Sequence, residues 1–182
     1  MRIISGMAGG RRLKAPKTSE TRPVTGRARE AVFSSIGGLV RDKNVVDLYA
    51  GSGSFGLEAL SRGAATAVFV ESGRLALAAL KENVETIGLG GVIVGQAVQD
   101  FLDRTVERFD LVFVDPPWDL PTDVLEQDLE MIDRVLDPGG VVVASRRHTD
   151  RPPAPPESWR VATDKRYGDT RILRYEKGTE AE

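Results

Sequence analysis

Hydrophobic residues in most of the chain alternate between short continuous runs and segments with helical spacing. Continuous runs rich in Val and Phe are typical of strands buried on both faces, and apolar residues at every third or fourth position are typical of helices with one buried side. The predicted strands are residues 45–49, 67–70, 92–94, 111–114 and 141–144. The predicted helices are residues 55–62, 74–87, 99–106 and 124–136. This alternation predicts an α/β fold with a mostly parallel sheet covered on both faces.

The first 40 residues depart from this alternation. Ile3-Ile4 and Leu13 flank a glycine-rich turn, which predicts a short hairpin. Residues 27–36 have helical spacing, and either Thr25 or Gly26 can cap that helix. We therefore expect the chain to begin with a small hairpin and helix extension.

The C-terminal part is expected to close the sheet with antiparallel pairing. Residues 160–162 and 172–175 predict a terminal hairpin on the sheet edge, and Asp137-Pro138-Gly139-Gly140 predicts a turn before the last parallel strand. We expect the extension at residues 1–40 to be followed by one α/β domain at 41–176 and a flexible tail at 177–182.

Composition limits the chemistry that this chain can perform. Its 182 residues are 41% hydrophobic, which is enough for the core of one domain. It has no cysteine, which excludes disulfides, zinc–thiolate sites and a thiolate nucleophile. No apolar run approaches the ~20 residues that cross a bilayer, and the first residues lack the apolar core of a signal peptide. We expect a cytoplasmic protein.

The net charge of −2 conceals an asymmetry. Residues 1–30 carry a net charge of +6, and the rest of the chain carries −8. A basic segment on an acidic body is typical of a protein that contacts a polyanion such as RNA. The candidate phosphate contacts are Arg11, Arg12, Arg22, Arg27 and Arg29.

A glycine-rich motif follows the first strand of the alternating region. Gly51-Ser52-Gly53-Ser54-Phe55-Gly56 matches G-x-G-x-x-G, in which glycines permit a tight turn and close approach of a ligand. Glu71 ends the next predicted strand, where an acid accepts from the ribose hydroxyls of an adenosine cofactor. This spacing fits both a dinucleotide and S-adenosylmethionine. Asp47 favours the latter, because a carboxylate there can receive the ammonium of a methionine moiety and would repel a pyrophosphate.

The sequence Asp115-Pro116-Pro117-Trp118 follows a later apolar strand. Because proline lacks the N–H that a strand needs, the chain must turn there. The turn leaves a carboxylate, a proline carbonyl and an aromatic face at the sheet edge. Two acceptors beside an aromatic ring suit a planar base that carries an amine.

These motifs together resemble class I S-adenosylmethionine methyltransferases and, more narrowly, the RsmD family, which methylates guanine N2 in 16S ribosomal RNA. The resemblance covers nearly the whole chain. Besides the glycine motif and D-P-P-W, it includes Arg2 to Gly6, Gly10 to Leu13, Arg22 to Thr25, Leu57 to Gly63 and Lys165 to Thr170. The chain departs from the family pattern at Gly26, where an acid is usual, at Trp118, where Phe or Tyr is commoner, and at Gln96-Ala97-Val98, where the family often has an acid for adenine.

The resemblance implies a Rossmann-like methyltransferase sheet, mostly parallel with an antiparallel C-terminal strand, and S-adenosyl-L-methionine as the cofactor. It implies that the catalytic residues are Asp115, Pro116, Pro117 and Trp118, with Asp115 and the Pro116 carbonyl holding the target amine and Trp118 stacking on guanine. The partner would be 16S ribosomal RNA within an assembling small subunit, with no metal and no membrane. The implied cofactor contacts are Asp47, Tyr49, Gly51, Ser52, Gly53, Glu71, Ser72, Ala97 and Val98.

Other functions also fit parts of the pattern. A methyltransferase acting on DNA adenine or protein glutamine would use the same amine-holding groups on another substrate. An NAD-dependent oxidoreductase would use the glycine motif for a pyrophosphate, which Asp47 disfavours. A non-catalytic RNA-binding module would leave D-P-P-W without a role.

Overall fold

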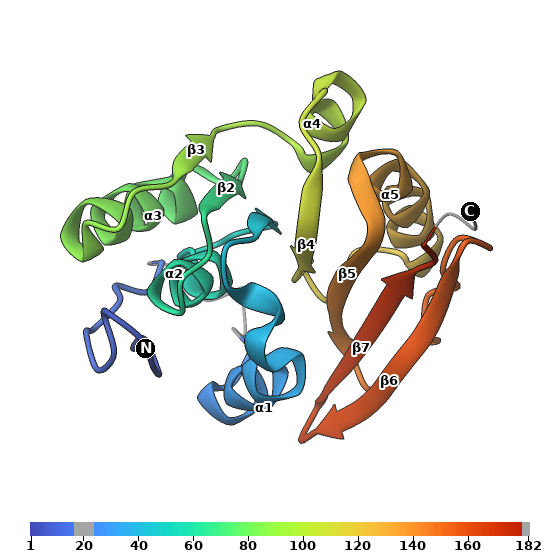
Figure 1. Ribbon diagram of the computed structural model, residues 1–182, viewed down its shortest axis with the longest axis horizontal. Coiled ribbons are helices and arrows are strands. Elements are labelled where there is room, and N and C mark those ends of the chain that lie inside the picture. Colours follow the sequence, from blue (N-terminus) through green and yellow to red (C-terminus); the bar gives the residue numbers. More distant parts are fainter. Residues whose placement is uncertain (17–23, 180–182) are drawn as a thin grey trace.

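The computed structural model describes residues 1–16 and 24–179, which form a seven-stranded sheet in the order β3-β2-β1-β4-β5-β7-β6 (Figure 1). Strands β1 to β5 run parallel to one another, and β7 runs antiparallel to both β5 and β6. The predicted α/β sheet with one antiparallel C-terminal strand is confirmed. The strands are β1 (Asn44–Leu48), β2 (Thr66–Val70), β3 (Val92–Val94), β4 (Phe109–Val114), β5 (Leu136–Arg147), β6 (Trp159–Tyr167) and β7 (Thr170–Lys177).

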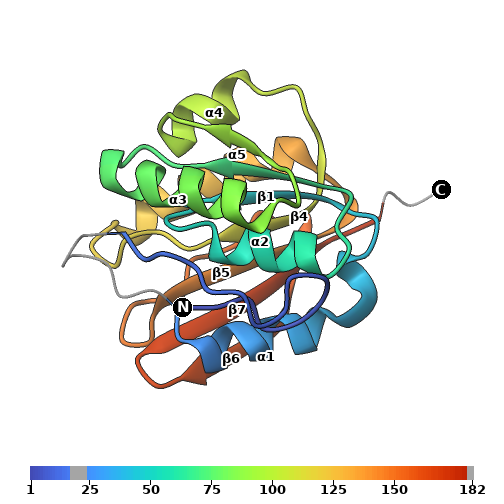
Figure 2. The ribbon, with the colours of Figure 1, turned by 90° about the vertical axis from the view of Figure 1, so that its left-hand side faces the viewer.

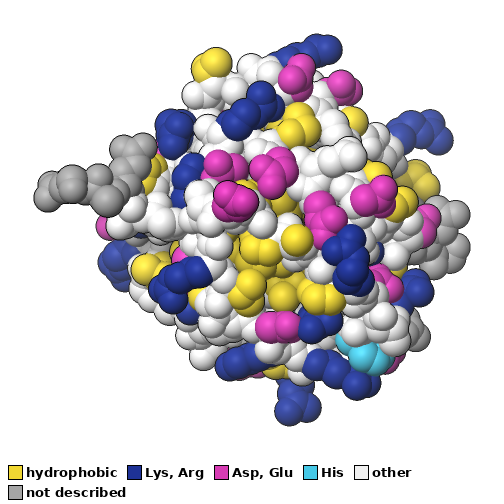
Figure 3. Space-filling model, turned by 90° about the vertical axis from the view of Figure 1, so that its right-hand side faces the viewer, with side chains coloured by type: hydrophobic (Ala, Val, Ile, Leu, Met, Phe, Trp, Pro, Cys, Tyr) yellow, Lys and Arg dark blue, Asp and Glu magenta, His cyan; other side chains and the backbone are white. Residues whose placement is uncertain are grey.

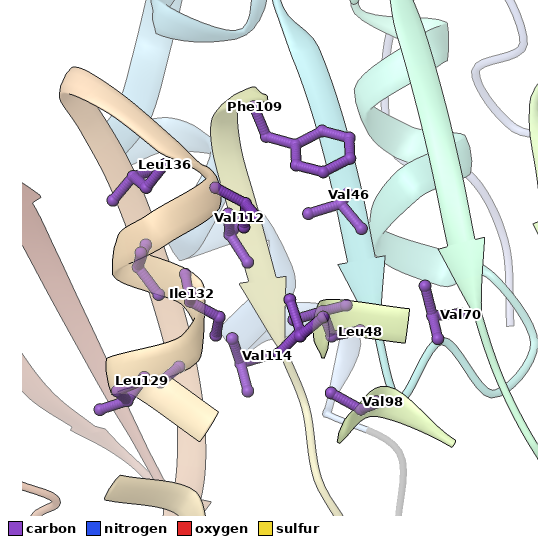
Figure 4. Close-up of a cluster of buried hydrophobic side chains, with 14 of the residues drawn as sticks. Val46, Leu48, Val70, Val98, Phe109, Val112, Val114, Leu129, Ile132 and Leu136 are labelled. Atoms are coloured by element: carbon purple, nitrogen blue, oxygen red, sulfur yellow. The ribbon is translucent and has the colours of Figure 1, made fainter. Parts of the chain in front are cut away.

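Helices cover both faces of the sheet (Figures 1 and 2). Alternate residues of each strand point to opposite faces, so Val46 and Leu48 pack towards α4 and α5 while Val45 packs towards α1 and α2. Figure 4 shows the first of these clusters, in which side chains of β4 lie against α5. The helices are α1 (Gly26–Ile36), the 3₁₀ turn η1 (Gly37–Val40), α2 (Ser54–Ser61), α3 (Arg74–Ile87), α4 (Val98–Arg104) and α5 (Thr122–Val135).

Two predicted boundaries need correction. The sequence at 137–140 does not separate α5 from the last parallel strand, because β5 already begins at Leu136. Its extra residues form an irregularity in the pairing with β4, where the register shifts between Phe109 and Leu111. The tail also begins later than predicted, since Lys177 is the last residue of β7 and its ammonium donates to the carbonyl of Asp133.

The N-terminal arm, residues 1–16, is built into the body of the molecule. Figure 2 shows it running between α1 on one side and α2 and α3 on the other. Ile3 and Leu13 are buried in the same cluster as Leu57 and Phe69, and a bridge between Arg2 and Arg12 closes the predicted hairpin. The arm is therefore part of the folded core and not a detachable appendage.

Two buried polar side chains fasten the arm. The carboxylate of Glu58 accepts from the backbone N–H groups of Ile4 at 2.6 Å and Ser5 at 3.1 Å. The amide of Asn83 accepts from the N–H of Lys14 and donates to both its carbonyl and that of Ser52. Asn83 therefore joins the arm to the glycine motif.

The face that carries the β6–β7 hairpin has mixed charge. In Figure 3, acidic side chains gather in its upper half, Lys and Arg follow its lower rim, and hydrophobic side chains are exposed between them. Within residues 1–16 and 24–179, no helix combines the length and hydrophobicity needed to cross a membrane.

Candidate active site

The loop after β1 owes its shape to three left-handed residues. Tyr49, Gly51 and Gly53 have φ angles of 58°, 56° and 80°. A Cβ atom added to Gly51 would approach only the Tyr49 carbonyl, at 4.0 Å, so this side of the loop is open to a ligand. The position therefore fits the predicted close approach of a cofactor to the backbone.

The other two glycines of the motif serve packing. A Cβ atom on Gly53 would lie 2.5 Å from Leu80, and one on Gly56 would lie 2.4 Å from the ring of Phe69. These glycines let α2 approach β2 and α3 closely. Gly53 was predicted to contact the cofactor, but its Cα faces the core, so any contact must come through its backbone.

Glu71 lies beside the open side of this loop, as its spacing predicted. One carboxylate oxygen accepts from the N–H of Gly51 at 2.8 Å. The other accepts from the N–H groups of Ser72 at 2.9 Å and Gly73 at 2.7 Å. Glu71 is only partly buried, so its oxygens can also accept from a ligand hydroxyl.

Asp47 lies deeper than the sequence suggested. It is 1% exposed, and its carboxylate accepts from the N–H of Gly56 at 2.9 Å. Burial raises its pKa well above the ordinary value, the Gly56 N–H opposes this, and the nearby carboxylates of Asp115 and Glu71 raise it further. Asp47 therefore braces the glycine motif, and its contact with an ammonium stays a prediction.

Asp115 follows β4 at the same edge of the sheet, because β4 pairs with β1. Its N–H donates to the Leu48 carbonyl, and its carboxylate accepts from the buried hydroxyl of Ser145, which lies on β5. Burial raises the pKa of Asp115 to about 6, and the hydrogen bond from Ser145 acts in the opposite direction. A carboxylate with a pKa near neutrality is typical of a group that exchanges protons with a substrate.

The rest of the D-P-P-W sequence forms a turn. The Pro117 carbonyl accepts from the N–H of Leu120 at 3.0 Å. Trp118 is half-buried, and the Arg147 guanidinium lies over its ring, 5.1 Å from the ring centre. Arg147 thus covers one face of the indole, and stacking of Trp118 on a base stays a prediction.

A hydrogen-bonded group that the sequence interpretation missed lies near the start of α4. The hydroxyl of Tyr49 donates to Asp128 at 2.6 Å, and the Gln99 amide donates to Asp128 at 2.7 Å. Burial raises the pKa of both Tyr49 and Asp128. Hydrogen bonds with Asp128 and Gln99 thus fix the hydroxyl group of Tyr49, a residue predicted to contact the cofactor. Of the predicted adenine contacts, Ala97 caps α4 and is partly exposed, and Val98 is buried.

The five predicted phosphate contacts have different surroundings. Arg12 and Arg27 are exposed, and Arg22 lies outside the described residues. Arg11 donates to the carbonyls of Thr86 and Ile87 at the end of α3, so it holds the arm. Arg29 is 1% exposed, and its contact with a phosphate stays a prediction.

Some of these missed residues had a signal in the sequence. Glu58 and Asp128 interrupt the apolar sides of their helices, and a charge in such a position is buried with partners. Ser145 and Arg147 end a strand at the same edge as Asp115. No three acidic or histidine side chains within the described residues gather closely enough to hold a metal ion.

Comparison with known proteins now adds to this geometry. The family model described as Conserved hypothetical protein 95 matches residues 1–176. The chain belongs to this family. Two relatives called ribosomal RNA small subunit methyltransferase D support the resemblance to the RsmD family. The one from Escherichia coli K12 is 31% identical over 100% of this chain and 92% of its own length, and the one from Haemophilus influenzae is 30% identical over 92% and 89%.

A solved structure supports the same family assignment. The structure called "Putative methyltransferase yhhF from Escherichia coli" superposes with a TM-score of 0.88 at 30% identity, over 99% of both chains. Because this superposition covers 99% of the present chain, the arm and the β6–β7 hairpin are part of the shared fold.

Proposed function

We propose that this protein is a ribosomal RNA methyltransferase that transfers a methyl group from S-adenosyl-L-methionine to the exocyclic N2 amine of a guanine in small-subunit RNA. One observation carries the proposal: the D-P-P-W turn and the open side of the glycine loop meet at one edge of the sheet, where Asp115 and Glu71 both lie close enough to Asp47 to raise its pKa. The family relatives act on ribosomal RNA by name.

The residues after β1 and β2 fit the proposed cofactor. The open side of Gly51 admits a ligand against the backbone, and Glu71 has carboxylate oxygens available for ribose hydroxyls. The acidic surroundings suit a cation and would repel a pyrophosphate. S-adenosyl-L-methionine, when bound, supplies a methyl group already activated by a positive sulfur. Ser52, Ser72, Ala97 and Val98 remain proposed contacts of its polar ends and its adenine.

The D-P-P-W turn suits a guanine amine. The lone pair of N2 is delocalised into the ring, so the amine becomes nucleophilic only when its N–H bonds are held in a fixed direction. The Asp115 carboxylate and the Pro116 carbonyl supply two acceptors for those N–H groups, and Trp118 supplies a stacking face. Methylation leaves one excess proton on N2, and the Asp115 carboxylate is the nearby group whose pKa of about 6 suits its removal.

The proposed substrate also accounts for the basic N-terminal residues. Arg12 and Arg27 are exposed beside the acidic body and can meet phosphates. We further propose that the RNA is presented within an assembling small subunit, and that the protein acts in the cytoplasm, where that assembly takes place.

The test is methylation of small-subunit RNA taken from cells that lack this protein. Wild-type protein with S-adenosyl-L-methionine should convert one guanosine into N2-methylguanosine, identified by mass spectrometry, and Asp115→Asn should not. If the methylated product were instead methyladenine in DNA or methylglutamine in protein, the proposed RNA substrate would be wrong. Calorimetric binding of NAD without binding of S-adenosyl-L-methionine would overturn the proposal.

Glu71→Ala tests the cofactor site separately. Loss of hydrogen bonds to a charged group should weaken binding of S-adenosyl-L-methionine by ~1–3 kcal/mol in calorimetry. Glu82→Ala, which removes an exposed acid on α3, is the matched control. Unchanged affinity of the Glu71 variant would remove this residue from the site.

A further inference from the structure

A cavity of about 550 Å³ lies between the N-terminal arm and the start of α1. Three of its lining residues are arginines, Arg2, Arg12 and Arg29, and its lining includes a single acid, Glu30. None of its described lining residues belongs to the glycine loop or to the D-P-P-W turn. The cavity is therefore a second feature of the molecule, separate from the candidate active site.

Arg29 is the unusual member of this lining. It is 1% exposed, and its Nη2 donates to the carbonyl of Arg2. Its Nε and Nη1 are also buried, and no acceptor for them lies within the described residues. A buried guanidinium with two unused donors is costly, because each unpaired donor has lost its hydrogen bond to water.

The acid that attracts Arg29 does not supply acceptors for these two donors. Glu58 attracts Arg29, but its carboxylate already accepts from two backbone N–H groups of the arm and from the guanidinium of Arg62. Arg62 repels Arg29 in turn. The surroundings of Arg29 therefore keep a positive charge, which Arg2 and Arg12 increase at the opening of the cavity.

The start of α1 adds to this charge. Gly26, the first residue of this 11-residue helix, lines the cavity, and no acid lies in the first turn. The positive end of a helix dipole favours an anion at that position. A Cβ atom added to Gly26 would meet none of the described residues within 4 Å, so these residues leave free space beside this helix end.

We propose that this cavity binds a phosphate of the RNA backbone. Arginine forks and a helix N-terminus are both complementary to a phosphate, which offers several acceptor oxygens in a small volume. The proposal rests on the proposed function, because that function brings an RNA backbone to the arm. A bound phosphate would hold the strand at a fixed point beside α1, separate from the contacts that hold the target base.

Gly26→Asp is the decisive variant. It puts a negative charge into the cavity and, because an acid is favourable at a helix N-terminus, should leave the fold at least as stable. Gly26→Ala adds the Cβ atom without the charge. Gly38→Asp adds the same charge in the η1 turn, where a Cβ atom also meets nothing within 4 Å. Arg29→Met removes the buried guanidinium.

The measurements are RNA affinity against salt and methylation kinetics, with an unmethylated small-subunit RNA transcript as the probe. Gly26→Asp and Arg29→Met should raise KM for RNA ~10-fold and lower the salt slope by roughly one phosphate contact. Turnover at saturating RNA and calorimetric affinity for S-adenosyl-L-methionine should not change. Gly26→Ala and Gly38→Asp should behave as wild type.

Inorganic phosphate provides a readout that does not depend on RNA. At constant ionic strength it should raise the midpoint of thermal unfolding of wild type and Gly26→Ala, but not of Gly26→Asp. If Gly26→Asp keeps the wild-type KM and salt slope while methylation proceeds, the cavity proposal is overturned and the proposed function stands. If wild type methylates no RNA but Gly26→Asp alone loses the phosphate effect, the proposed function fails and the phosphate site stands.

Discussion

The loop after β1 and the loop after β4 reach the same edge of the sheet but differ in how their polar groups are used. In the first loop, Gly51, Gly56 and Ser52 are fastened by the side chains of Glu71, Asp47 and Asn83. In the second, the one described side chain that donates to the Asp115 carboxylate belongs to Ser145. Pro117 is exposed in this loop, and Trp118 is half-buried.

This difference suggests separate roles for the two loops: the loop after β1 positions a cofactor, and the loop after β4 takes part in the reaction. In the loop after β1, Leu80 packs directly against Gly53 and Phe69 packs directly against Gly56. This packing restricts the loop to one conformation, as a cofactor site requires. In the loop after β4, the Asp115 carboxylate has a pKa of about 6 and few hydrogen-bond partners, so its oxygens can accept hydrogen bonds from a substrate. Substitutions after β1 should therefore cost stability or cofactor affinity, and substitutions after β4 should cost turnover.

The largest effect is expected at Asp115. Asp115→Asn should lower turnover by ~10²–10⁴-fold, the usual contribution of a positioned acid or base, while affinity for S-adenosyl-L-methionine stays within a few-fold. Single-turnover methylation and calorimetry measure the two quantities. Asp119→Asn, which neutralises an exposed acid in the same loop, should be near wild type. Wild-type turnover in Asp115→Asn would show that the loop after β4 does not carry the chemical step.

Gly56→Ala changes the glycine motif after β1 and should lower the free energy of unfolding. Its Cβ atom would lie 2.4 Å from the Phe69 ring, and such overpacking costs ~1–3 kcal/mol in denaturant unfolding. Adding Phe69→Leu should restore part of the loss. Gly51→Ala, whose Cβ atom has open space, should cost only the strain of its left-handed backbone, ~1 kcal/mol. Equal stability of wild type and Gly56→Ala would show that α2 can move away from β2.

Trp118→Ala should lose ~1–3 kcal/mol of stacking on the target base, seen as weaker RNA binding and slower methylation. Trp118→Phe should be mild, because it keeps an aromatic face. The free energy of unfolding should change little in either variant, since Trp118 is only half-buried. A large loss of stability in Trp118→Ala would make the ring a structural element.

The smallest effect is a displacement of the pH profile. Turnover should rise as the pH passes about 6, because Asp115 accepts hydrogen bonds best when ionised. Ser145→Ala removes a bond to the ionised form, so the pKa of Asp115 and this limb of the profile should move upward. A profile that moves downward, or not at all, would separate Ser145 from the Asp115 carboxylate.

The raised pKa of Asp115 also sets how the free energy of unfolding changes with pH. The pKa of Asp115 in the folded protein lies above its ordinary value of 3.8. The stability contributed by its neutral form is fully present below pH 3.8 and is lost as the pH rises through about 6. Unfolding free energies of Asp115→Asn should therefore decline less than those of wild type between pH 4 and 8.

Much of this arrangement was predictable from the sequence. The helix at Arg74–Ile87 and the strand at Val92–Val94 match their predicted bounds, because hydrophobic periodicity there is uninterrupted. Glu71 and Asp115 lie at the predicted sheet edge, because parallel strands end on one side. Strand ends followed by glycine or proline thus locate the site from sequence alone.

The features that the sequence did not predict depend on contacts between distant segments. Arg29 was predicted to contact a phosphate, but its burial beneath residues 1–16 was not predicted. Asp47 was predicted to contact an ammonium, but its burial and its hydrogen bond from the N–H of Gly56 were not predicted. The predicted turn at 137–140 lies inside β5 as an irregularity, because Leu136 before it and Val141 after it both pair with β4. None of these contacts has a local signal.

The amide of Asn83 gives the molecule a property of a different kind. It bonds Lys14 of the arm and Ser52 of the glycine loop at once, so the two segments share one rigid connection. If RNA orders the arm in a way that tightens this loop, cofactor binding must strengthen RNA binding by the same factor, because thermodynamic linkage is reciprocal. The two ligands would then behave as heterotropic effectors of each other across α3. Asn83→Ala, titrated with each ligand in the presence and absence of the other, would measure that coupling.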